Sequence, residues 1–334
     1  MNTNQTSKLS HSNASTINRS TANSSNSEEL LVVKNLSVSF IQYAKGLKQL
    51  NLEVICDLNV SVNSGEIVAI VGSSGSGKSL LAHAILGILP SNAKVTGTIR
   101  YQGQALTTER LKVFRGREIS LIPQSVNYLD PLMKVGEQVQ NTIRTKDAKQ
   151  LQQQVFERYH LSKEAGLLYP FQLSGGMARR VLVATAVSGG AKLIIADEPT
   201  PGLHPEVVAE TLTHLKELAN QGCGVMMITH DIEAAMKIAD RIAVFYAGTT
   251  VEVAPIEDFK ERGEALRHPY TRALWMALPE NDFKPIPGFQ PTPTDLPPGC
   301  LFEPRCQLRT AECQCGKPEM QDLRGGQVRC IHAT

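Results

Sequence analysis

A glycine-rich stretch near residue 75 constrains the fold more than any other part of the sequence. It reads GSSGSGKS from Gly72 to Ser79 and matches the pattern G-x-x-x-x-G-K-[S/T] in full. The apolar segment EIVAIV precedes it and LLAHAILGIL follows it, so the stretch is predicted to connect a buried strand to a helix. In that setting the glycines let backbone N–H groups turn toward phosphate oxygens. The sequence therefore predicts a nucleoside triphosphate site in an α/β fold.

All eight residues of this loop are candidate nucleotide-binding residues. Lys78 is expected to reach the β- and γ-phosphates, and the hydroxyl of Ser79 is expected to ligate Mg²⁺. A chance run of glycine and serine is the alternative, and the apolar segments on both sides argue against it. The remaining members of the predicted site are Gly72, Ser73, Ser74, Gly75, Ser76 and Gly77.

Polar residues at the ends of three other apolar segments extend the predicted site. LIIADE ends in Asp197, expected to bind the metal through water, and Glu198, expected to orient or deprotonate the attacking water. MMITH ends in His230 and ISLIPQ ends in Gln124, and both are candidate catalytic residues; Gln124 is also a candidate Mg²⁺ ligand. Each of these residues also has an interpretation without a role in catalysis. The acid pair could be a solvated strand end, and the histidine could be structural. Their weight comes from a shared position, because ligands of open α/β sheets bind at the ends of the strands.

The composition limits the classes of protein that fit. With 34 basic and 32 acidic residues the net charge is +2, which argues against a surface that coats nucleic acid. No run reaches the roughly 18 apolar residues that a membrane span needs. Residues 1–29 are rich in Asn, Ser and Thr and lack an apolar core, which predicts a disordered tail and no secretory signal. These features together predict a cytosolic protein.

The order of the apolar segments predicts three parts. Residues 30–255 are predicted to form an α/β domain with a mostly parallel sheet, because strands and helices alternate in their second half. The beginning of this domain is β-rich, with a predicted hairpin at 96–106, and indicates an antiparallel β subdomain. A polar helical stretch at about 126–175 indicates an inserted helical subdomain. Proline then becomes frequent, and residues 256–334 are predicted to be a cysteine-containing C-terminal extension.

A second glycine-rich turn points to a family. LSGGM at residues 173–177 opens onto an apolar helix, the form of an anion-binding site. The candidate residues in this turn are Ser174, Gly175 and Gly176. With this turn, the phosphate loop and the strand-end residues in the same order, residues 30–255 resemble the ATP-binding cassette (ABC) superfamily, whose core is a P-loop ATPase fold.

The resemblance implies a dimer. In that family the signature turn caps the γ-phosphate of ATP held by a second cassette, and the two cassettes pack head to tail. Ser174 is therefore expected to serve the site of a partner ATPase. The resemblance also implies an aromatic residue that stacks on adenine, for which Phe40 is the best match and Tyr43 the alternative.

The spacing of the motifs favours a transporter subunit within this superfamily. Lys78 and Ser174 are 96 residues apart (174 − 78), and the chain holds a single cassette. ABC proteins that act mechanically in DNA repair or translation usually carry a long insertion or two cassettes. Such a mechanical role is the alternative.

The C-terminal region narrows the resemblance further. LRHPYTRALWMALP, LPPGCLFEPRC and VRCIHA, together with VNYLDPLMKVGEQV after Gln124, resemble the ATPases of the oligopeptide/dipeptide/nickel importer family. The resemblance implies a peripheral ATPase at the cytoplasmic face of the inner membrane that hydrolyses ATP to drive uptake of peptides or nickel. Its implied partners are two membrane permeases, a second and different ATPase, and a substrate-binding protein, with no nucleic acid.

Cysteines crowd the end of the chain. Some members of this importer family hold a [4Fe–4S] cluster on cysteines spaced C-x5-C-x6-C-x16-C, and four thiolates suit iron–sulfur or zinc chemistry. Free thiols are the third interpretation, and Cys315 is an alternative to Cys313 as a ligand. Cys56 and Cys223 stand alone and are predicted to be small buried residues. The four candidate ligands are Cys300, Cys306, Cys313 and Cys330.

His204 departs from the family pattern. The family usually has Asp at this position, and the resemblance implies that this Asp helps to hold two cassettes together beside the nucleotide. With His204 at this position the anion is absent. The two ATP sites between the paired cassettes, each formed by residues of both cassettes, would then be unequal. A tolerated residue at the start of a helix is the alternative.

Overall fold

A computed structural model describes residues 29–43 and 49–334. The tail that was predicted to be disordered lies outside these residues, apart from its last position. Strand β1 begins at Glu29, within one residue of the predicted start of ordered structure. Among the described residues, no helix combines the length and the apolar character that a membrane crossing requires.

The N-terminal part forms an antiparallel sheet of four strands in the order β2-β1-β4-β5. The predicted hairpin at 96–106 is present, with β4 paired to β5. Helix α2 follows it and is capped by Thr107, whose hydroxyl accepts from the N–H of Arg110. The bounds are β1 Glu29–Tyr43, β2 Gln49–Asn63, β4 Ala93–Tyr101, β5 Gln104–Ala105 and α2 Thr108–Phe114.

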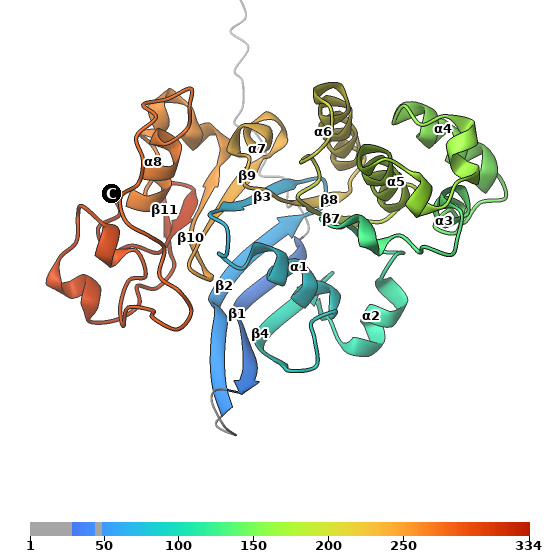
Figure 1. Ribbon diagram of the computed structural model, residues 1–334. Coiled ribbons are helices and arrows are strands. Elements are labelled where there is room, and N and C mark those ends of the chain that lie inside the picture. The colour runs from blue at the N-terminus through green and yellow to red at the C-terminus, as the bar shows by residue number, and fades with distance from the viewer. Residues whose placement is uncertain (1–28, 44–48) are drawn as a thin grey trace, which may run out of the picture.

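A second sheet runs through the centre of the molecule (Figure 1). It has eight strands in the order β11-β12-β10-β9-β3-β8-β7-β6. Five consecutive strands of this sheet run parallel, as the alternation of strands and helices predicts. They are β9, β3, β8, β7 and β6. The bounds are β3 Ile67–Gly72, β6 Ile119–Ile122, β7 Leu193–Asp197, β8 Gly224–Ile228, β9 Arg241–Tyr246 and β10 Thr249–Pro255.

The side chains of β3 show how this sheet lies between two cores. Ile67, Ala69 and Val71 belong to one hydrophobic cluster, and Val68 and Ile70 belong to the other. Successive residues of a strand point to opposite faces, so one strand supplies both cores. Complete burial of each such Val or Ile contributes about 1.5–3 kcal/mol, which fixes β3 and therefore the loop that follows it.

Helices cover the sheet and form a lobe at one end (Figure 1). The lobe contains α3, α4 and short 3-10 turns, in the region where an inserted helical subdomain is predicted. It is joined to the core by the salt bridge of Arg158 with Glu210 of α6, at 2.6 Å. The bounds are α1 Lys78–Leu86, α3 Val135–Gln140, α4 Ala148–Arg158, α5 Gly175–Val187, α6 Pro205–Asn220 and α7 Ile232–Ile238.

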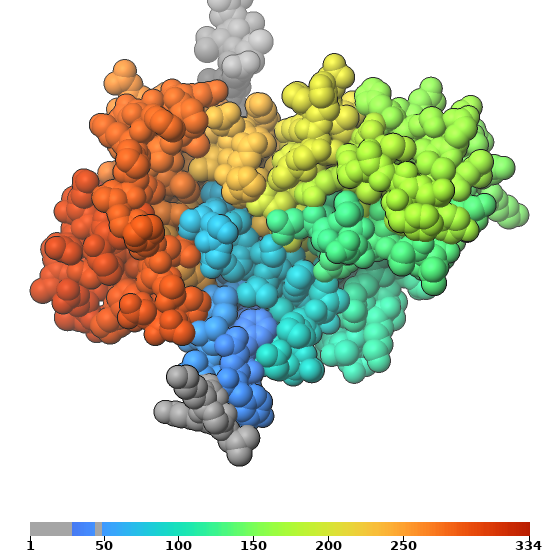
Figure 2. Space-filling model, viewed as in Figure 1, coloured from blue at the N-terminus to red at the C-terminus, as the bar shows by residue number. Residues whose placement is uncertain are grey.

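The C-terminal extension occupies the opposite end of the molecule in the same view (Figure 2). It contains helix α8, Pro269–Met276, and a hairpin of strands β11, Gln321–Leu323, and β12, Gly326–Val328. Strand β12 pairs antiparallel with β10, so the extension lengthens the central sheet by two strands. The sequence gives little sign of this pairing, because both strands have only three residues.

Candidate nucleotide-binding site

The loop between β3 and α1 forms the wall of an open pocket of about 560 Å³. Gly77, with φ 92°, immediately precedes α1, and a Cβ there would lie 3.0 Å from the side chain of Ile55. Glycine is therefore required both by the backbone conformation and by the close approach of β2. The pocket is lined by Val54, Ser74, Gly75, Ser76, Gly77, Lys78, Ser79, Leu80, Gln124, Glu198 and His230.

Lys78 is buried against this loop. Its ammonium donates to the carbonyl oxygens of Gly72 and Ser73, at 2.9 and 3.1 Å. Burial lowers the pKa of Lys78, while the nearby carboxylates of Glu198 and Asp197 act in the opposite direction. The lysine is thus a cation among backbone oxygens and acids, at the wall of a pocket suited to phosphate.

Asp197 and Ser79 come together from two elements. The hydroxyl of Ser79, in the first turn of α1, donates to Asp197 Oδ1 at 3.1 Å, at the end of β7. Burial raises the pKa of Asp197, and this hydrogen bond opposes the shift. A carboxylate and a hydroxyl side by side offer the oxygen ligands that Mg²⁺ prefers.

Glu198 has an unusual backbone conformation. Its φ is 50°, in the left-handed region, where a residue with a Cβ is uncommon. Its N–H donates to the carbonyl of Ile228 at 2.9 Å, which ties the end of β7 to β8. Strain of this kind is often retained where a side chain must point in a required direction. Glu198 is one of the residues that line the pocket.

The two carboxylate oxygens of Glu198 have different surroundings. His230 Nδ1 lies 2.9 Å from Oε1, from the end of the neighbouring strand. Oε2 is buried and has no hydrogen-bond partner among the described residues. Buried carboxylate oxygens are rarely left unpaired, so Oε2 is suited to a ligand or water in the pocket.

Arg179 belongs to this site and was missed by the sequence analysis. It lies in the first half of α5, and its guanidinium donates to the carbonyl of Gln124 at 2.6 Å and to the carbonyl of Glu198. Burial lowers the pKa of Arg179. Its position in the helix that follows LSGGM was the available signal, but the sequence did not say which face of that helix meets the sheet.

The signature turn lies away from this pocket. Ser174 precedes α5, and its hydroxyl accepts from the N–H of Met177 at 3.3 Å. Ser174 and Gly175 are exposed, and the described residues that line the pocket include none of the turn. This placement leaves the turn available to another molecule.

The predicted adenine-stacking residue lies in the antiparallel sheet. Phe40 is half-buried against the second hydrophobic core, and Tyr43 is exposed. Among the described residues, Val54 of β2 lines the pocket whereas Phe40 and Tyr43 do not. Stacking by Phe40 stays a prediction.

The four cysteines of the extension face one small cavity of about 10 Å³. His332 lines it as well, with Nε2 3.4 Å from the thiol of Cys313. Burial raises the pKa of Cys300 to about 11 and raises those of Cys306 and Cys330. Within the described residues no three His, Cys, Asp or Glu side chains are arranged as ready metal ligands. The four thiols line one cavity, and its small volume means that a metal centre there would require side-chain movement. Metal binding by these cysteines stays a prediction.

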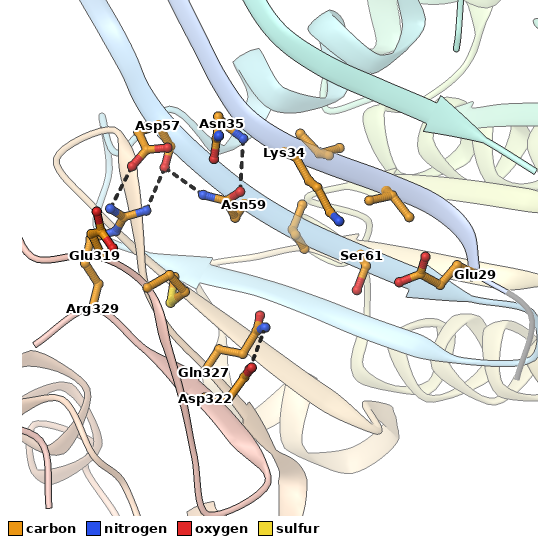
Figure 3. A pocket seen from close by; sticks show the side chains of 14 residues that line it. Glu29, Lys34, Asn35, Asp57, Asn59, Ser61, Glu319, Asp322, Gln327 and Arg329 are labelled. Carbon is orange, nitrogen blue, oxygen red and sulfur yellow. Dashed lines mark hydrogen bonds and ion pairs between the residues drawn. The ribbon is translucent and has the colours of Figure 1, made fainter. Parts of the chain in front are cut away.

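A second large pocket, of about 490 Å³, lies where the extension meets the antiparallel sheet (Figure 3). Arg329, next to Cys330 in the chain, is buried and donates to the carboxylate and the carbonyl of Asp57, at 2.7 and 3.0 Å. It also donates to the carbonyl of Pro318 at 3.0 Å. Asn59 donates to the Asp57 carbonyl at 3.1 Å. Because these polar groups form hydrogen bonds with one another, we interpret them as a contact that holds the extension against β2.

The two isolated cysteines differ. Cys223 is buried, as predicted. Cys56 is only half-buried, and the ammonium of Lys317 lies 2.7 Å from its thiol. The prediction of burial was wrong for Cys56 because the extension supplies a polar partner that the local sequence of β2 does not reveal.

Comparison with known proteins agrees with this geometry. Residues 55–201 match the family model described as ABC transporter, and residues 251–313 match the model of the oligopeptide/dipeptide transporter C-terminal region. The oligopeptide transport ATP-binding protein OppD of Haemophilus influenzae is 36% identical over 318 residues, which cover 90% of this chain and 96% of that protein. The chain belongs to the ABC transporter family. It is an ABC ATPase, as the two glycine-rich motifs predict.

Other comparisons support the same family and fold. The oligopeptide transport ATP-binding protein AppD of Bacillus subtilis is 34% identical, over 90% of this chain and 96% of that protein. The ATP-binding cassette MJ0796, solved as a dimer with ADP and Pi, has a TM-score of 0.59 and 24% identity, and the match covers 68% of this chain and 99% of that one. This last likeness concerns the fold alone.

Proposed function

We propose that this ABC ATPase hydrolyses ATP to power an importer of peptides. The observation that carries the proposal is the position of Glu198, which lines one pocket with the phosphate loop and whose buried Oε2 has no partner among the described residues. The names of OppD and AppD favour peptides over nickel as the cargo. They also favour a transport role over a mechanical role in DNA repair or translation.

Each polar residue of the pocket has a task in hydrolysis. Glu198 orients the attacking water through Oε2 and accepts its proton, and His230 holds the carboxylate through Oε1. Lys78 and the backbone N–H groups of the loop bind the β- and γ-phosphates. Arg179 fixes the carbonyls of Gln124 and Glu198 and so positions both side chains.

Mg²⁺ fits the oxygen donors that gather beside the loop. Ser79 and Gln124 would hold it directly, and Asp197 through water. When bound, the ion supplies positive charge to the phosphate oxygens as negative charge develops on them.

The proposal includes a partner for the signature turn. The signature turn would cap ATP held by a second ATPase, and the signature turn of that ATPase would cap the ATP held by this chain. The residues of the turn here are Ser174, Gly175 and Gly176. Exposure of Ser174 and Gly175 supports this role. Two permeases and a substrate-binding protein would complete the importer, with this chain at the cytoplasmic face of the inner membrane.

We also propose that Cys300, Cys306, Cys313 and Cys330 hold a [4Fe–4S] cluster. Their convergence on one cavity supports this assignment. The cluster would supply a cross-link between loops and a redox-active centre.

Peptide uptake by cells that lack this gene tests the proposed function. Cells that regain the parent chain should take up a labelled oligopeptide, and cells that receive Glu198→Gln should not, although both chains accumulate equally. Uptake of nickel but not peptide in the complemented cells would overturn the assigned cargo.

A further inference from the structure

The C-terminal extension reaches the phosphate loop through one side chain. The hydroxyl of Ser73 donates to Gln290 Oε1 at 2.5 Å, and the N–H of Ala247 donates to the same oxygen at 3.3 Å. Gln290 therefore joins the loop after β3 to the turn after β9. The two residues of the first bond are 217 positions apart in the chain, and both are half-buried.

Ser73 in turn contacts the lysine that is proposed to bind phosphate. Its carbonyl accepts from Lys78 Nζ at 3.1 Å, beside the carbonyl of Gly72. The path Gln290–Ser73–Lys78 thus consists of two successive hydrogen bonds. A side chain that fixes Ser73 also fixes one of the two carbonyls that hold the ammonium.

Arg305 holds the segment that carries Gln290. Its guanidinium donates to the carbonyls of Pro287 and Ile286, at 2.8 and 3.1 Å, and to the hydroxyl of Tyr246 at 3.2 Å. It also lies over the ring of Tyr246, 5.8 Å from its centroid. Tyr246 is the last residue of β9 and immediately precedes Ala247. Arg305 and Gln290 therefore form hydrogen bonds with neighbouring residues of the same turn.

Arg305 is also adjacent to the cysteine-lined cavity. Cys306, the next residue, lines that cavity, and its N–H donates to the carbonyl of Glu303 at 3.0 Å. A continuous set of bonds and peptide links therefore connects the cavity to the phosphate loop. Rigid networks of this kind can carry energetic coupling between two sites.

We propose that Gln290 is a positioning residue for ATP binding and that Arg305 links it to the cysteine-lined cavity. The inference rests on the proposed function, since it concerns the same ATP site. Gln290 fixes the position of Ser73. The carbonyls of Ser73 and Gly72 then hold the ammonium of Lys78, which would bind the phosphates. The extension is in this way part of the ATP site, in addition to any contact it makes with other proteins.

Affinity for Mg·ATP in three full-length variants tests the role of Gln290. Gln290→Ala should weaken binding about three- to tenfold, because loss of a hydrogen bond of this kind typically has an effect of this size. Gln290→Glu keeps an acceptor for both donors but adds negative charge against a loop that binds a polyanion, so it should weaken binding more than Gln290→Ala. Gln327→Ala, in the same extension, removes an exposed hydrogen bond to Asp322 and should leave affinity unchanged.

Stability and kinetics separate positioning from a merely structural role. Gln290→Ala should raise the KM for ATP in the assembled importer while kcat stays within about twofold, and the urea midpoint of the isolated chain should match that of Gln327→Ala. Parental affinity in both Gln290 variants, or a fall in the urea midpoint without a change in affinity, would overturn the proposal. A parent chain that binds no ATP would instead overturn the proposed function.

A double variant tests the link through Arg305. If Arg305 acts through Gln290, then Arg305→Ala should weaken Mg·ATP binding in the same direction, and Arg305→Ala with Gln290→Ala should be no weaker than the weaker single variant. Effects that multiply in the double variant would show that the two residues act independently and would overturn the link.

Discussion

The phosphate pocket and the cysteine-lined cavity gather reactive side chains in different ways. In the pocket, Glu198 and His230 lie just after the ends of adjacent parallel strands, and Ser79 lies in the first turn of α1. The result is an open space of about 560 Å³ with one buried oxygen of Glu198 unpaired among the described residues. The cavity is formed by short turns, and its thiols nearly close a space of about 10 Å³.

We interpret the open pocket as a site of turnover and the nearly closed cavity as one that would retain the proposed cluster. An open pocket admits and releases a nucleotide, and regular strands fix its catalytic groups. The cysteine-lined cavity is too small to admit a ligand without side-chain movement, so a group bound there would exchange slowly. Variants at Lys78, Ser174 and the cavity cysteines test this contrast, in order of decreasing expected effect on the ATP site.

Lys78→Ala should have the largest effect on nucleotide binding. Removal of a buried cation that meets phosphate costs about 1.5–3 kcal/mol, which corresponds to a roughly ten- to hundredfold loss of affinity. Titration calorimetry with Mg·ATP measures it. Lys192→Ala, which removes an exposed lysine paired with Glu118, is the control and should bind as the parent does. Equal affinity in the two variants would contradict the role of the loop.

Ser174→Arg should damage hydrolysis only when a second ATPase is present. The substitution places bulk at the exposed start of α5, so ATP binding by this chain alone should stay within about twofold of the parent. In the assembled importer, phosphate release should fall at least about twofold, since the site completed by this turn is lost.

Ser162→Arg provides a matched control for this experiment. Ser162 is also an exposed serine that caps a turn in the helical lobe, with its hydroxyl 3.3 Å from the N–H of Ala165. Loss of either cap has a similar effect on stability, about 1 kcal/mol. A silent Ser174→Arg, or an equal loss in Ser162→Arg, would argue against a shared site.

Replacement of the cavity thiols should remove metal and change ATP affinity less than Gln290→Ala does, because the cavity meets the phosphate loop only indirectly, through Arg305 and Gln290. Anaerobic iron, sulfide and zinc assays on Cys300→Ser with Cys306→Ser should give no bound cluster, while affinity for Mg·ATP changes less than about threefold. Cys315→Ser is the control, because Cys315 is exposed and outside the cavity-lining residues among those described. Iron that persists in the double variant but disappears in Cys315→Ser would refute the ligand assignment.

The two regions also differ in how far the sequence predicts them. Glu198, His230 and Gln124 follow apolar strands, and parallel strands of one sheet end at the same edge, so their convergence follows from the pattern. Arg179 was not predicted, because a helix sequence does not say which side chain turns toward the loop carbonyls. The role of Phe40 depends on the adenine itself and stays a prediction.

The extension was harder to predict for a physical reason. Strands β11 and β12 have only three residues each, too few for a pattern with a period of two to stand out. Gln290 has no distinguishing sequence context, since its partner Ser73 is 217 residues away. The cysteine spacing singled out four residues that line one cavity, but it did not reveal His332 beside Cys313.

ATP binding and phosphate release in Glu198→Gln, measured on the same sample of the assembled importer, test the account most directly. Glutamine keeps the size of the side chain but cannot accept a proton from water, so phosphate release should fall about 10²–10³-fold while bound ATP stays within about twofold of the parent. Glu257→Gln, an exposed carboxylate outside the pocket, should behave as the parent. Phosphate release at the parental rate with Glu198→Gln would contradict the assignment of this pocket as the site of hydrolysis.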